Sequence, residues 1–357
     1  MATTLDLRTL QWLSKEYHDM NGTHYETLDK PPSALEFSRL VHISRPVVIK
    51  GFEVHALERW TDEYLIERMG DRKISIAVTP NGRADAITPG PDGKLYFVEP
   101  HIQQMTMHNF LLSLAPNTEK MSWPAENQEI CYLQSQNGNM YTSQFFESSP
   151  DQERQSELSE FEPLKADVPS EIPWCSQAFD RSPDAVNLWI GDSRSVTSIH
   201  SGSDPYENIY TVIRGTKHFT LLPPTDGWYL QERIYPHATY TRPSPVSTLT
   251  TTPSPLTTSP IRWSSILNPH LPDTLPREAH PMHISLKAGE TLYLPAGWWH
   301  HVRQGLDENF SNAERGEELK EEKTIAVNWW YDFEGRGMGW VWLNLLRSGD
   351  VPYGNTT

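Results

Sequence analysis

Two histidines in this chain have neighbours that suggest a metal site. His200 ends the short β run SVTSIH, and Asp204 follows it four residues later. His300 ends the aromatic run LYLPAGWWH, 100 residues further along the chain. Two histidines and one carboxylate brought together form the facial triad that holds Fe(II) and leaves coordination positions open for a chelating cosubstrate and O₂. Because the chain has 14 histidines, two metal-free histidines at the rim of a β protein remain an alternative on this pattern alone.

Short β runs would position these side chains. From about residue 130 onward, runs with aromatic alternation recur at 130–136, 185–191, 195–200, 208–215, 217–224, 283–302 and 324–332. Many short strands without alternating helices favour an antiparallel barrel or jelly roll over a doubly wound parallel sheet. We therefore predict a mainly β protein in which distant strands supply the two histidines.

The first 125 residues have a different pattern, typical of helices with a few strands. Apolar spacing and turn residues predict helices at 5–20, 33–40 and 60–69 and strands at 47–49 and 74–80. Thr4 is the expected cap of the first helix. We expect residues 1–125 to form a helical and β region that packs on the barrel, and residues 126–357 to form the barrel and an apolar C-terminal helix at 338–348.

Two segments interrupt the predicted barrel. Between Thr241 and Pro260, 11 residues are Ser or Thr and five are Pro. This stretch has too little apolar surface to fold by itself. The run 306–323 is dominated by charged residues. We expect mobile surface insertions at about 241–282 and 304–323.

Composition excludes several classes of protein. The chain has 357 residues, of which 37% are hydrophobic and 11% aromatic, so it is not an intrinsically disordered chain. It has 30 Lys and Arg against 46 Asp and Glu, a formal net charge of -16. This acidity argues against direct binding to nucleic acid or to an anionic membrane, because both require a basic surface. It suits a basic protein partner, although solubility alone explains it equally well.

The sequence also gives expectations about the compartment. The N-terminus has no apolar stretch of the signal-peptide kind, and no window approaches the ~18 uninterrupted apolar residues of a membrane helix. The two cysteines, Cys131 and Cys175, cannot make a disulfide framework or a cysteine-rich zinc site. We expect a protein of a reducing compartment, either the cytoplasm or the nucleus.

The sequence around both histidines resembles the JmjC branch of the cupin-fold 2-oxoglutarate oxygenases. The motifs are TSIH, then DPYENIYTVIRGTKHFTLLPP, GETLYLPAGWWHHV and IAVNWWYD. Upstream, LDKPPSALEFSRLVHISRPVVIKG, AVTPNGRADAI and IPWCSQAFDRSPDAVNLWIGD are similar to family members that hydroxylate a lysine of translation-associated GTPases. The resemblance covers nearly the whole chain except the two insertions, and it implies a double-stranded β-helix barrel of the cupin type.

The resemblance implies roles for individual residues. His200, Asp204 and His300 would be the Fe(II) ligands, with His301 a neighbour and not a ligand. Lys217 has the family's offset for the lysine that pairs with the distal carboxylate of 2-oxoglutarate, and a buried dicarboxylate needs such a cation. On residue type alone, Lys217 would be a surface lysine after a glycine turn. The implied cosubstrate site further contains Thr197, Tyr132, Asn208, Asn328 and Trp330.

The implied enzyme uses Fe(II), 2-oxoglutarate and O₂ to hydroxylate a lysine side chain of a basic protein substrate. Demethylation of a protein or histone lysine by the same iron chemistry is an alternative, as is a binding protein that has lost its iron. A zinc-dependent sugar-isomerase-like cupin is disfavoured, because Lys217 and the WWHH and NWW motifs would have no role in it. The apolar C-terminal helix makes a homodimer a further expectation.

One feature departs from the family motif. The family has His-x-Asp, whereas this chain has His-Ser-Gly-Ser-Asp, with two additional residues. Residues two apart in a strand face the same way about 6.5 Å from each other, whereas four extended residues span ~13 Å. If Asp204 is to share a metal with His200, the intervening Ser-Gly-Ser must therefore form a tight turn. Ser and Gly permit such a turn, so retention and loss of Asp204 as a ligand both remain open.

Overall fold

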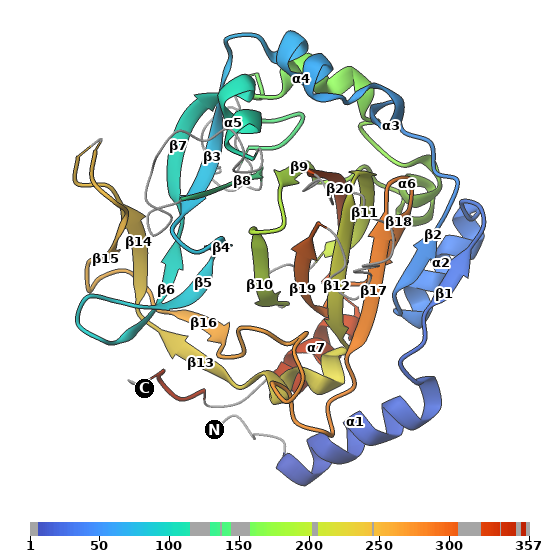
Figure 1. Ribbon diagram of the computed structural model, residues 1–357. Coiled ribbons are helices and arrows are strands. Elements are labelled where there is room, and N and C mark those ends of the chain that lie inside the picture. Colours follow the sequence, from blue (N-terminus) through green and yellow to red (C-terminus); the bar gives the residue numbers. More distant parts are fainter. Residues whose placement is uncertain are drawn as a thin grey trace, which may run out of the picture.

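Two β-sheets face each other at the centre of the computed structural model (Figure 1). The structure describes residues 6–114, 129–135, 138–143, 158–201, 206–244, 246–305, 323–335, 337–347 and 351–354. Apolar side chains from both sheets meet in one interior cluster, which includes Tyr210 and Leu292 from the larger sheet and Phe219 and Ile284 from the smaller one. The predicted mainly β, cupin-like class is therefore confirmed.

The larger sheet has nine strands, and most of its neighbouring strands are antiparallel. Their order is β1 (Glu26–Leu28), β2 (Val47–Ile49), β18 (Thr291–Leu294), β11 (Tyr206–Arg214), β20 (Thr324–Asp332), β9 (Ala185–Gly191), β8 (Ile130–Gln134), β3 (Lys73–Thr79) and β7 (His101–Thr106). The smaller sheet has five strands, in the order β17 (Met282–Lys287), β12 (Thr216–Leu222), β19 (Trp299–Gln304), β10 (Val196–His200) and β4 (Arg83–Ala84).

Strands from the first 125 residues belong to both sheets. In the larger sheet, β2 pairs with β18 and β3 pairs with β8. In the smaller sheet, β4 pairs with β10. The N-terminal part of the chain therefore extends the barrel through backbone hydrogen bonds and does not merely pack against it.

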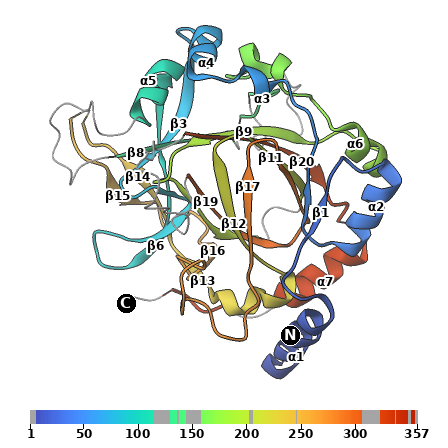
Figure 2. The same ribbon diagram turned by 45° about the vertical axis from the view of Figure 1, so that its right-hand side comes forward.

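Helices cover the edges and outer faces of the sheets. They are α1 (Leu7–Asn21), α2 (Ala34–Ile43), α3 (Ala56–Arg59), α4 (Asp62–Met69), α5 (Met107–Ser113), α6 (Pro173–Phe179) and α7 (Met338–Arg347), with 3-10 helices η3 (Glu162–Asp167) and η4 (Pro224–Leu230). Figure 2 shows α2 and α6 together beside the larger sheet, where Phe37 of α2 contacts Trp174 of α6 and Tyr293 of β18 at ring-centroid distances of 4.8 and 5.0 Å. No described helix has both the length and the apolar character that crossing a membrane requires.

Helix starts follow side-chain caps that the sequence predicts in part. Ser33 caps α2 in a capping box with Glu36, as expected for a helix that begins there. The cap of α1 is Asp6, whose side chain accepts a hydrogen bond from the Arg8 backbone, so the expectation of Thr4 is wrong. The helix predicted over 60–69 is α4, which begins at Asp62 after its cap Thr61, and the short helix α3 precedes it.

A second layer of hairpins lies beside the barrel (Figure 1). It contains β5 (Ala86–Pro89), β6 (Leu95–Glu99), β14 (His237–Thr241) and β15 (Thr250–Pro253) in one sheet, and β13 (Glu232–Tyr235) with β16 (Ile261–Ser264) in another. The insertion expected at 241–282 thus contains two strands and is not a plain loop. Backbone pairing with β14 and burial of Leu249 supply what the Ser- and Thr-rich sequence lacks by itself. Most of the second predicted insertion, residues 306–322, lies outside the described residues.

Candidate metal and cosubstrate site

A cavity that is partly open to solvent lies between the two sheets. Seven of the nine predicted site residues line it: Tyr132, Thr197, His200, Asn208, His300, Asn328 and Trp330. They come from five strands, β8, β10, β11, β19 and β20, that are far apart in the sequence. Lys217, the eighth, does not line the cavity, but its Nζ donates a hydrogen bond to Tyr132, which does.

A β-bulge in β10 turns His200 towards the cavity. Thr197 pairs with Val302 and His200 pairs with His300, so two residues of β10 oppose the single residue His301 of β19. Side chains alternate along a regular strand, so residues three apart would point to opposite faces. The additional residue in the bulge allows Thr197 and His200 to line the same cavity.

Each of the two cavity histidines is held by a backbone carbonyl at Nδ1. Their ring centroids are 4.2 Å apart. Nδ1 of His200 lies 2.7 Å from the carbonyl oxygen of Ser198, and Nδ1 of His300 lies 3.2 Å from that of Trp298. Because a carbonyl only accepts, Nδ1 carries the proton in both rings and the lone pair is on Nε2. This backbone-fixed tautomer is the arrangement that orients metal-binding histidines in proteins.

The third predicted ligand, Asp204, lies outside the described residues, as do Gly202 and Ser203. Among the residues that the structure does describe, no three His, Cys, Asp or Glu side chains are grouped closely enough to hold a metal ion. The last residue before this gap, Ser201, is buried and donates a hydrogen bond to the carbonyl of Gly297 at 2.9 Å. The participation of Asp204 therefore stays a prediction.

His301 lies on the opposite face of β19 from its neighbour His300. Its side chain is fully buried and stacks on His270 at a ring-centroid distance of 5.0 Å. Burial lowers the pKa of His301 to about 2, so its imidazole is neutral. It does not line the cavity, in agreement with the expectation that it is a neighbour of the metal ligand.

Lys217 is a buried residue of β12 and not a surface lysine. Only 1% of it is exposed, and its Nζ donates to Gln304 Oε1 and, at 3.4 Å, to Tyr132 OH. Within the described part of the chain, it forms no ion pair with a carboxylate. Burial lowers the pKa of Lys217 to about 7. A buried amine whose hydrogen bonds go only to neutral groups is suited to bind the carboxylate of a ligand.

The hydroxyls and amides around the cavity form two hydrogen-bonded groups. Burial raises the pKa of Tyr132 well above its usual range, and a hydrogen bond with Thr197 opposes that shift. On the facing side of the cavity, Asn328 donates to Asn208 Oδ1 at 2.8 Å. Trp189 donates from its indole nitrogen to Asn328 Oδ1, also at 2.8 Å. The interior therefore combines polar groups of fixed orientation with aromatic walls.

Several residues in or beside the cavity escaped the sequence analysis. Trp189 and Gln304 are absent from the predicted set, and so is Tyr206, which stacks on Trp330 at a centroid distance of 5.1 Å and an angle of 4°. Tyr206 is two residues from Asn208 on β11, Gln304 is in register with Lys217, and Trp189 is in register with Ala326, two residues from Asn328. Period-two alternation of side chains could therefore have identified them once the strands were paired.

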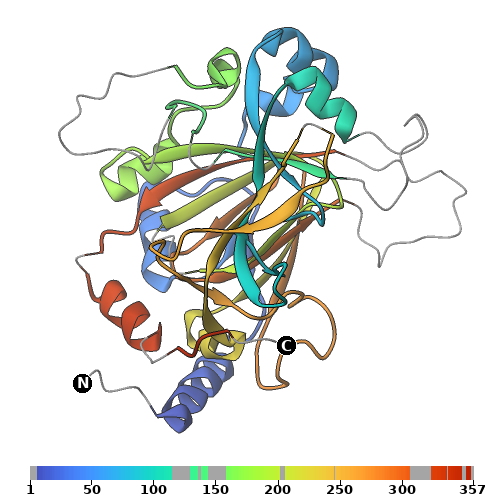
Figure 3. The ribbon, with the colours of Figure 1, turned by 90° about the vertical axis from the view of Figure 1, so that its left-hand side faces the viewer.

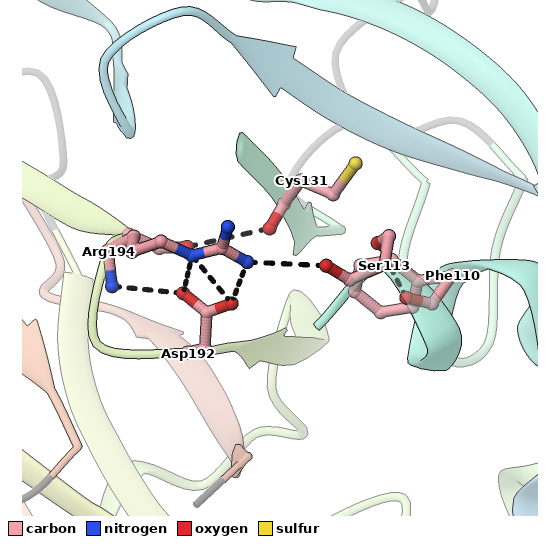
Figure 4. Close-up of polar contacts among 6 residues, drawn as sticks. Phe110, Ser113, Cys131, Asp192 and Arg194 are labelled. Atoms are coloured by element: carbon pink, nitrogen blue, oxygen red, sulfur yellow. Dashed lines mark hydrogen bonds and ion pairs between the residues drawn. The ribbon is translucent and has the colours of Figure 1, made fainter. Parts of the chain in front are cut away.

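The turn between β9 and β10 is fixed by buried charge (Figure 4). Asp192 is 1% exposed and pairs with the Arg194 guanidinium, which also donates to the Ser113 carbonyl of α5 at 3.2 Å. Ser195 donates to the Cys131 carbonyl of β8 at 3.5 Å. These contacts tie the start of β10, which carries Thr197 and His200, to β8, which carries Tyr132.

Comparisons with known proteins agree with this geometry. The model of the cupin-like domain family matches residues 32–336. The chain is 33% identical over 359 residues to the lysine-specific demethylase JMJ32 of Arabidopsis thaliana, covering 96% of this chain and 91% of that protein. It is 33% identical over 315 residues to the human bifunctional peptidase and (3S)-lysyl hydroxylase JMJD7, covering 86% and 84%. JmjC domain-containing protein E of Dictyostelium discoideum is 30% identical over 342 residues, covering 90% and 87%. This chain therefore belongs to the JmjC family of cupin-like oxygenases.

Proposed function

We propose that this protein is an Fe(II)- and 2-oxoglutarate-dependent oxygenase that hydroxylates a lysine side chain of a protein. The observation that carries the proposal is that one cavity combines two chemically distinct features. Two histidines with Nδ1 on backbone carbonyls line it, and the buried Lys217 donates a hydrogen bond to Tyr132 of its wall. A 2-oxo acid with a second carboxylate requires both a metal and a fixed cation.

The chain's own residues would bind the iron and the cosubstrate and orient them. His200 and His300, with Asp204, would hold the iron, and Lys217 with Tyr132 would hold the distal carboxylate of 2-oxoglutarate. The bound iron and cosubstrate supply the oxidising power, with O₂ as oxidant, 2-oxoglutarate going to succinate and CO₂, and one oxygen atom entering a substrate C–H bond. Apolar walls such as Phe219, Leu294 and Val302 exclude water from that reaction.

A lysine side chain fits the cavity and the charge of the chain. The stacked pair of Tyr206 and Trp330 gives the cavity a flat aromatic wall, against which the methylene stem of a lysine would pack. The formal net charge of -16 favours approach of a basic segment. Two of the relatives are named for reactions on lysine, one a hydroxylase and one a demethylase.

Demethylation is the second candidate, because the name of JMJ32 states it for that protein. Oxidation of an N-methyl C–H bond gives an alcohol whose carbon is lost as formaldehyde, whereas hydroxylation of a side-chain methylene leaves the oxygen on lysine. The product therefore separates the two reactions. Incubation with cell extract should yield lysine peptides heavier by one oxygen atom for a hydroxylase, and formaldehyde for a demethylase.

Anaerobic titration of the protein with Fe(II) and 2-oxoglutarate tests the proposal directly. A metal-to-ligand charge-transfer band is the expected result, since both carboxylate and oxo groups would chelate the iron. Absence of the band in the wild-type chain, together with its appearance after deletion of Gly202 and Ser203, would show instead a binding protein whose metal motif is broken.

A further inference from the structure

Gln304 lies beside Lys217, the proposed carboxylate-binding lysine. It is four residues after His300 on β19, so both side chains face the barrel interior. Only 4% of Gln304 is exposed. Its Oε1 accepts a hydrogen bond from Lys217, whereas its Nε2 is buried and has no hydrogen-bond partner within the described residues. A buried donor without an acceptor is costly, so this N–H group points to an acceptor that a ligand supplies.

The Gln304 amide packs against Gly191 of β9. A Cβ on Gly191 would lie 2.3 Å from Gln304 Nε2, 2.8 Å from the Tyr132 ring and 3.1 Å from Ser195 Oγ, so a glycine at this position leaves space for the amide. Lys217 Nζ donates both to Tyr132 OH and to Oε1 of the amide, so the amide and the tyrosine are neighbours of one ammonium group.

We propose that Gln304 Nε2 donates a hydrogen bond to the distal carboxylate of 2-oxoglutarate, alongside Lys217 and Tyr132. This inference rests on the proposed function, since that function supplies the dicarboxylate. A carboxylate accepts about four hydrogen bonds, and each one from an uncharged donor to an ion is stronger than between neutral groups. The amide does two things at once, because Oε1 orients the ammonium while Nε2 binds the ligand.

The residue type agrees with this role. A glutamate of the same size would neutralise Lys217 and repel an incoming carboxylate. A neutral amide leaves the single positive charge of Lys217 to the single negative charge of the ligand's distal end. Gln304 thus keeps the cation oriented without competing for its charge.

Substitutions at Gln304 and calorimetry test the proposal. Gln304→Met keeps the length of the side chain but removes the amide, and Gln304→Glu keeps the shape but adds charge. Binding of 2-oxoglutarate and of succinate to the Mn(II)-loaded protein should weaken about tenfold in Gln304→Met, the equivalent of one hydrogen bond to a charged group. It should weaken more than about a hundredfold in Gln304→Glu, which adds like-charge repulsion.

Three controls make the result specific. The affinity for Mn(II) should not change, and neither should the affinity for 2-oxopentanoate, which has the same carbon chain without the distal carboxylate. Gln104→Met removes an amide from an exposed position of β7 and should leave all affinities unchanged. Unfolding midpoints of the metal-free variants report whether each variant folds. Should Gln304→Met not fold, Gln304→Leu, which also lacks the amide, takes its place, because Gln304→Glu weakens binding through its charge whether or not Nε2 contacts the ligand.

Two outcomes would overturn the inference in different ways. If the wild-type protein binds 2-oxoglutarate and folded Gln304→Met binds it equally well, the amide only supports Lys217 and the proposed function stands. If the wild-type protein binds neither 2-oxoglutarate nor succinate, the proposed function fails and this inference fails with it.

Discussion

Lys217 has hydrogen-bond partners that are neutral, and this determines its chemistry. Its amine lies in the barrel interior with Tyr132 and Gln304, and the charged form is disfavoured because little water or counter-charge solvates it. By residue type alone, Lys217 is a lysine after a glycine turn. Only its spacing from Asp204, which matches the family motif, indicates that it binds the cosubstrate. The structure adds that Lys217 is a buried residue of β12, which is the position that the proposed role requires.

Replacement of this lysine should separate cosubstrate binding from metal binding. Lys217→Ala should raise the 2-oxoglutarate concentration needed for half-maximal turnover by about a hundredfold or more, since a buried charge pair cannot form. The Kd for Mn(II), measured by calorimetry, should change little. An equal loss of both affinities would contradict the assigned role and indicate a general structural defect.

The affinity for 2-oxoglutarate should depend on pH with a definite sign. Burial lowers the pKa of Lys217 to about 7, so above this pH the empty site holds a neutral amine. A bound carboxylate favours the protonated form, so binding takes up a proton and the affinity should fall by up to about tenfold per pH unit above 7. Calorimetry at pH 8 in two buffers of different ionisation enthalpy measures that uptake. An affinity that is flat or rises between pH 7 and 9 would contradict it.

The lowered pKa of Lys217 also affects the free energy of unfolding. In the unfolded chain a lysine has a pKa of about 10.4, so between about pH 7 and 10 the unfolded state binds more protons at this group than the folded state. The contribution of Lys217 to stability therefore rises with pH over that interval. Lys217→Met should remove this component when wild type and variant are compared by urea unfolding.

At the scale of the element, the bulge in β10 shows what strand patterns predict and what they omit. Alternation and turn residues predict most strands of the barrel with nearly correct bounds, but the single run expected at 283–302 is three strands, β17, β18 and β19, in two sheets. They place Thr197 and His200 on opposite faces, because a bulge depends on the partner strand β19 and leaves no mark in the local pattern. The resemblance assigned both residues to one site, and the bulge is the physical reason that they can share it.

The hairpin layer illustrates a second limit of local sequence. The Ser- and Thr-rich stretch after Thr241 lacks apolar residues, which predicts a loop. The structure forms β15 there because β14 supplies a pairing edge and because Tyr240 and Leu249 are buried in the core. Pairing with a distant strand decides whether this stretch forms a strand or a loop, and the composition of 20 residues gives no information about that pairing.

Gly82, which directly precedes β4 and lies beside the start of β10, gives a prediction at the scale of the element. Gly82 has φ of +75°, and a Cβ there would lie 1.9 Å from the Arg194 carbonyl oxygen. Its own carbonyl accepts from Val196, the first residue of β10. Gly82→Ala should lower the free energy of unfolding by at least about 2 kcal/mol, from backbone strain and the clash together.

Gly93 provides the matched control for that variant. Its φ is +77°, and a Cβ there would meet nothing within 4 Å. Gly93→Ala therefore incurs the conformational strain without the clash. Urea unfolding should show a clearly larger loss for Gly82→Ala, and equal losses for the two variants would argue against the close contact with Arg194.

At the scale of the whole molecule, two helices share one end of the barrel (Figure 3). Both α1 and α7 pack on η4. Ser14 of α1 donates to the buried Asp226 of η4 at 2.7 Å, and His18 stacks on His280 at 3.9 Å. The sequence predicts that the apolar residues of the C-terminal helix are buried, yet in the structure these remain exposed: Met338, Trp340, Val341, Trp342 and Leu345.

We propose that this exposed face of α7 is covered by a second copy of the chain. Exposed tryptophans grouped on one helix are typical of an interface. Sedimentation should show a dimer for the wild-type protein, and Trp340→Ser combined with Trp342→Ser should shift it towards monomer without lowering the unfolding midpoint of the monomer. A wild-type protein that stays monomeric at tens of micromolar would contradict the proposal.

The N-terminal strands have a practical consequence for anyone who shortens the chain. A fragment that starts near residue 126 would lack β2, β3 and β4, and β18, β8 and β10 would each lose a hydrogen-bonded neighbour. Exposed strand edges recruit other chains. Such a truncation is expected to precipitate on expression, although every residue proposed to bind metal or cosubstrate would still be present in it.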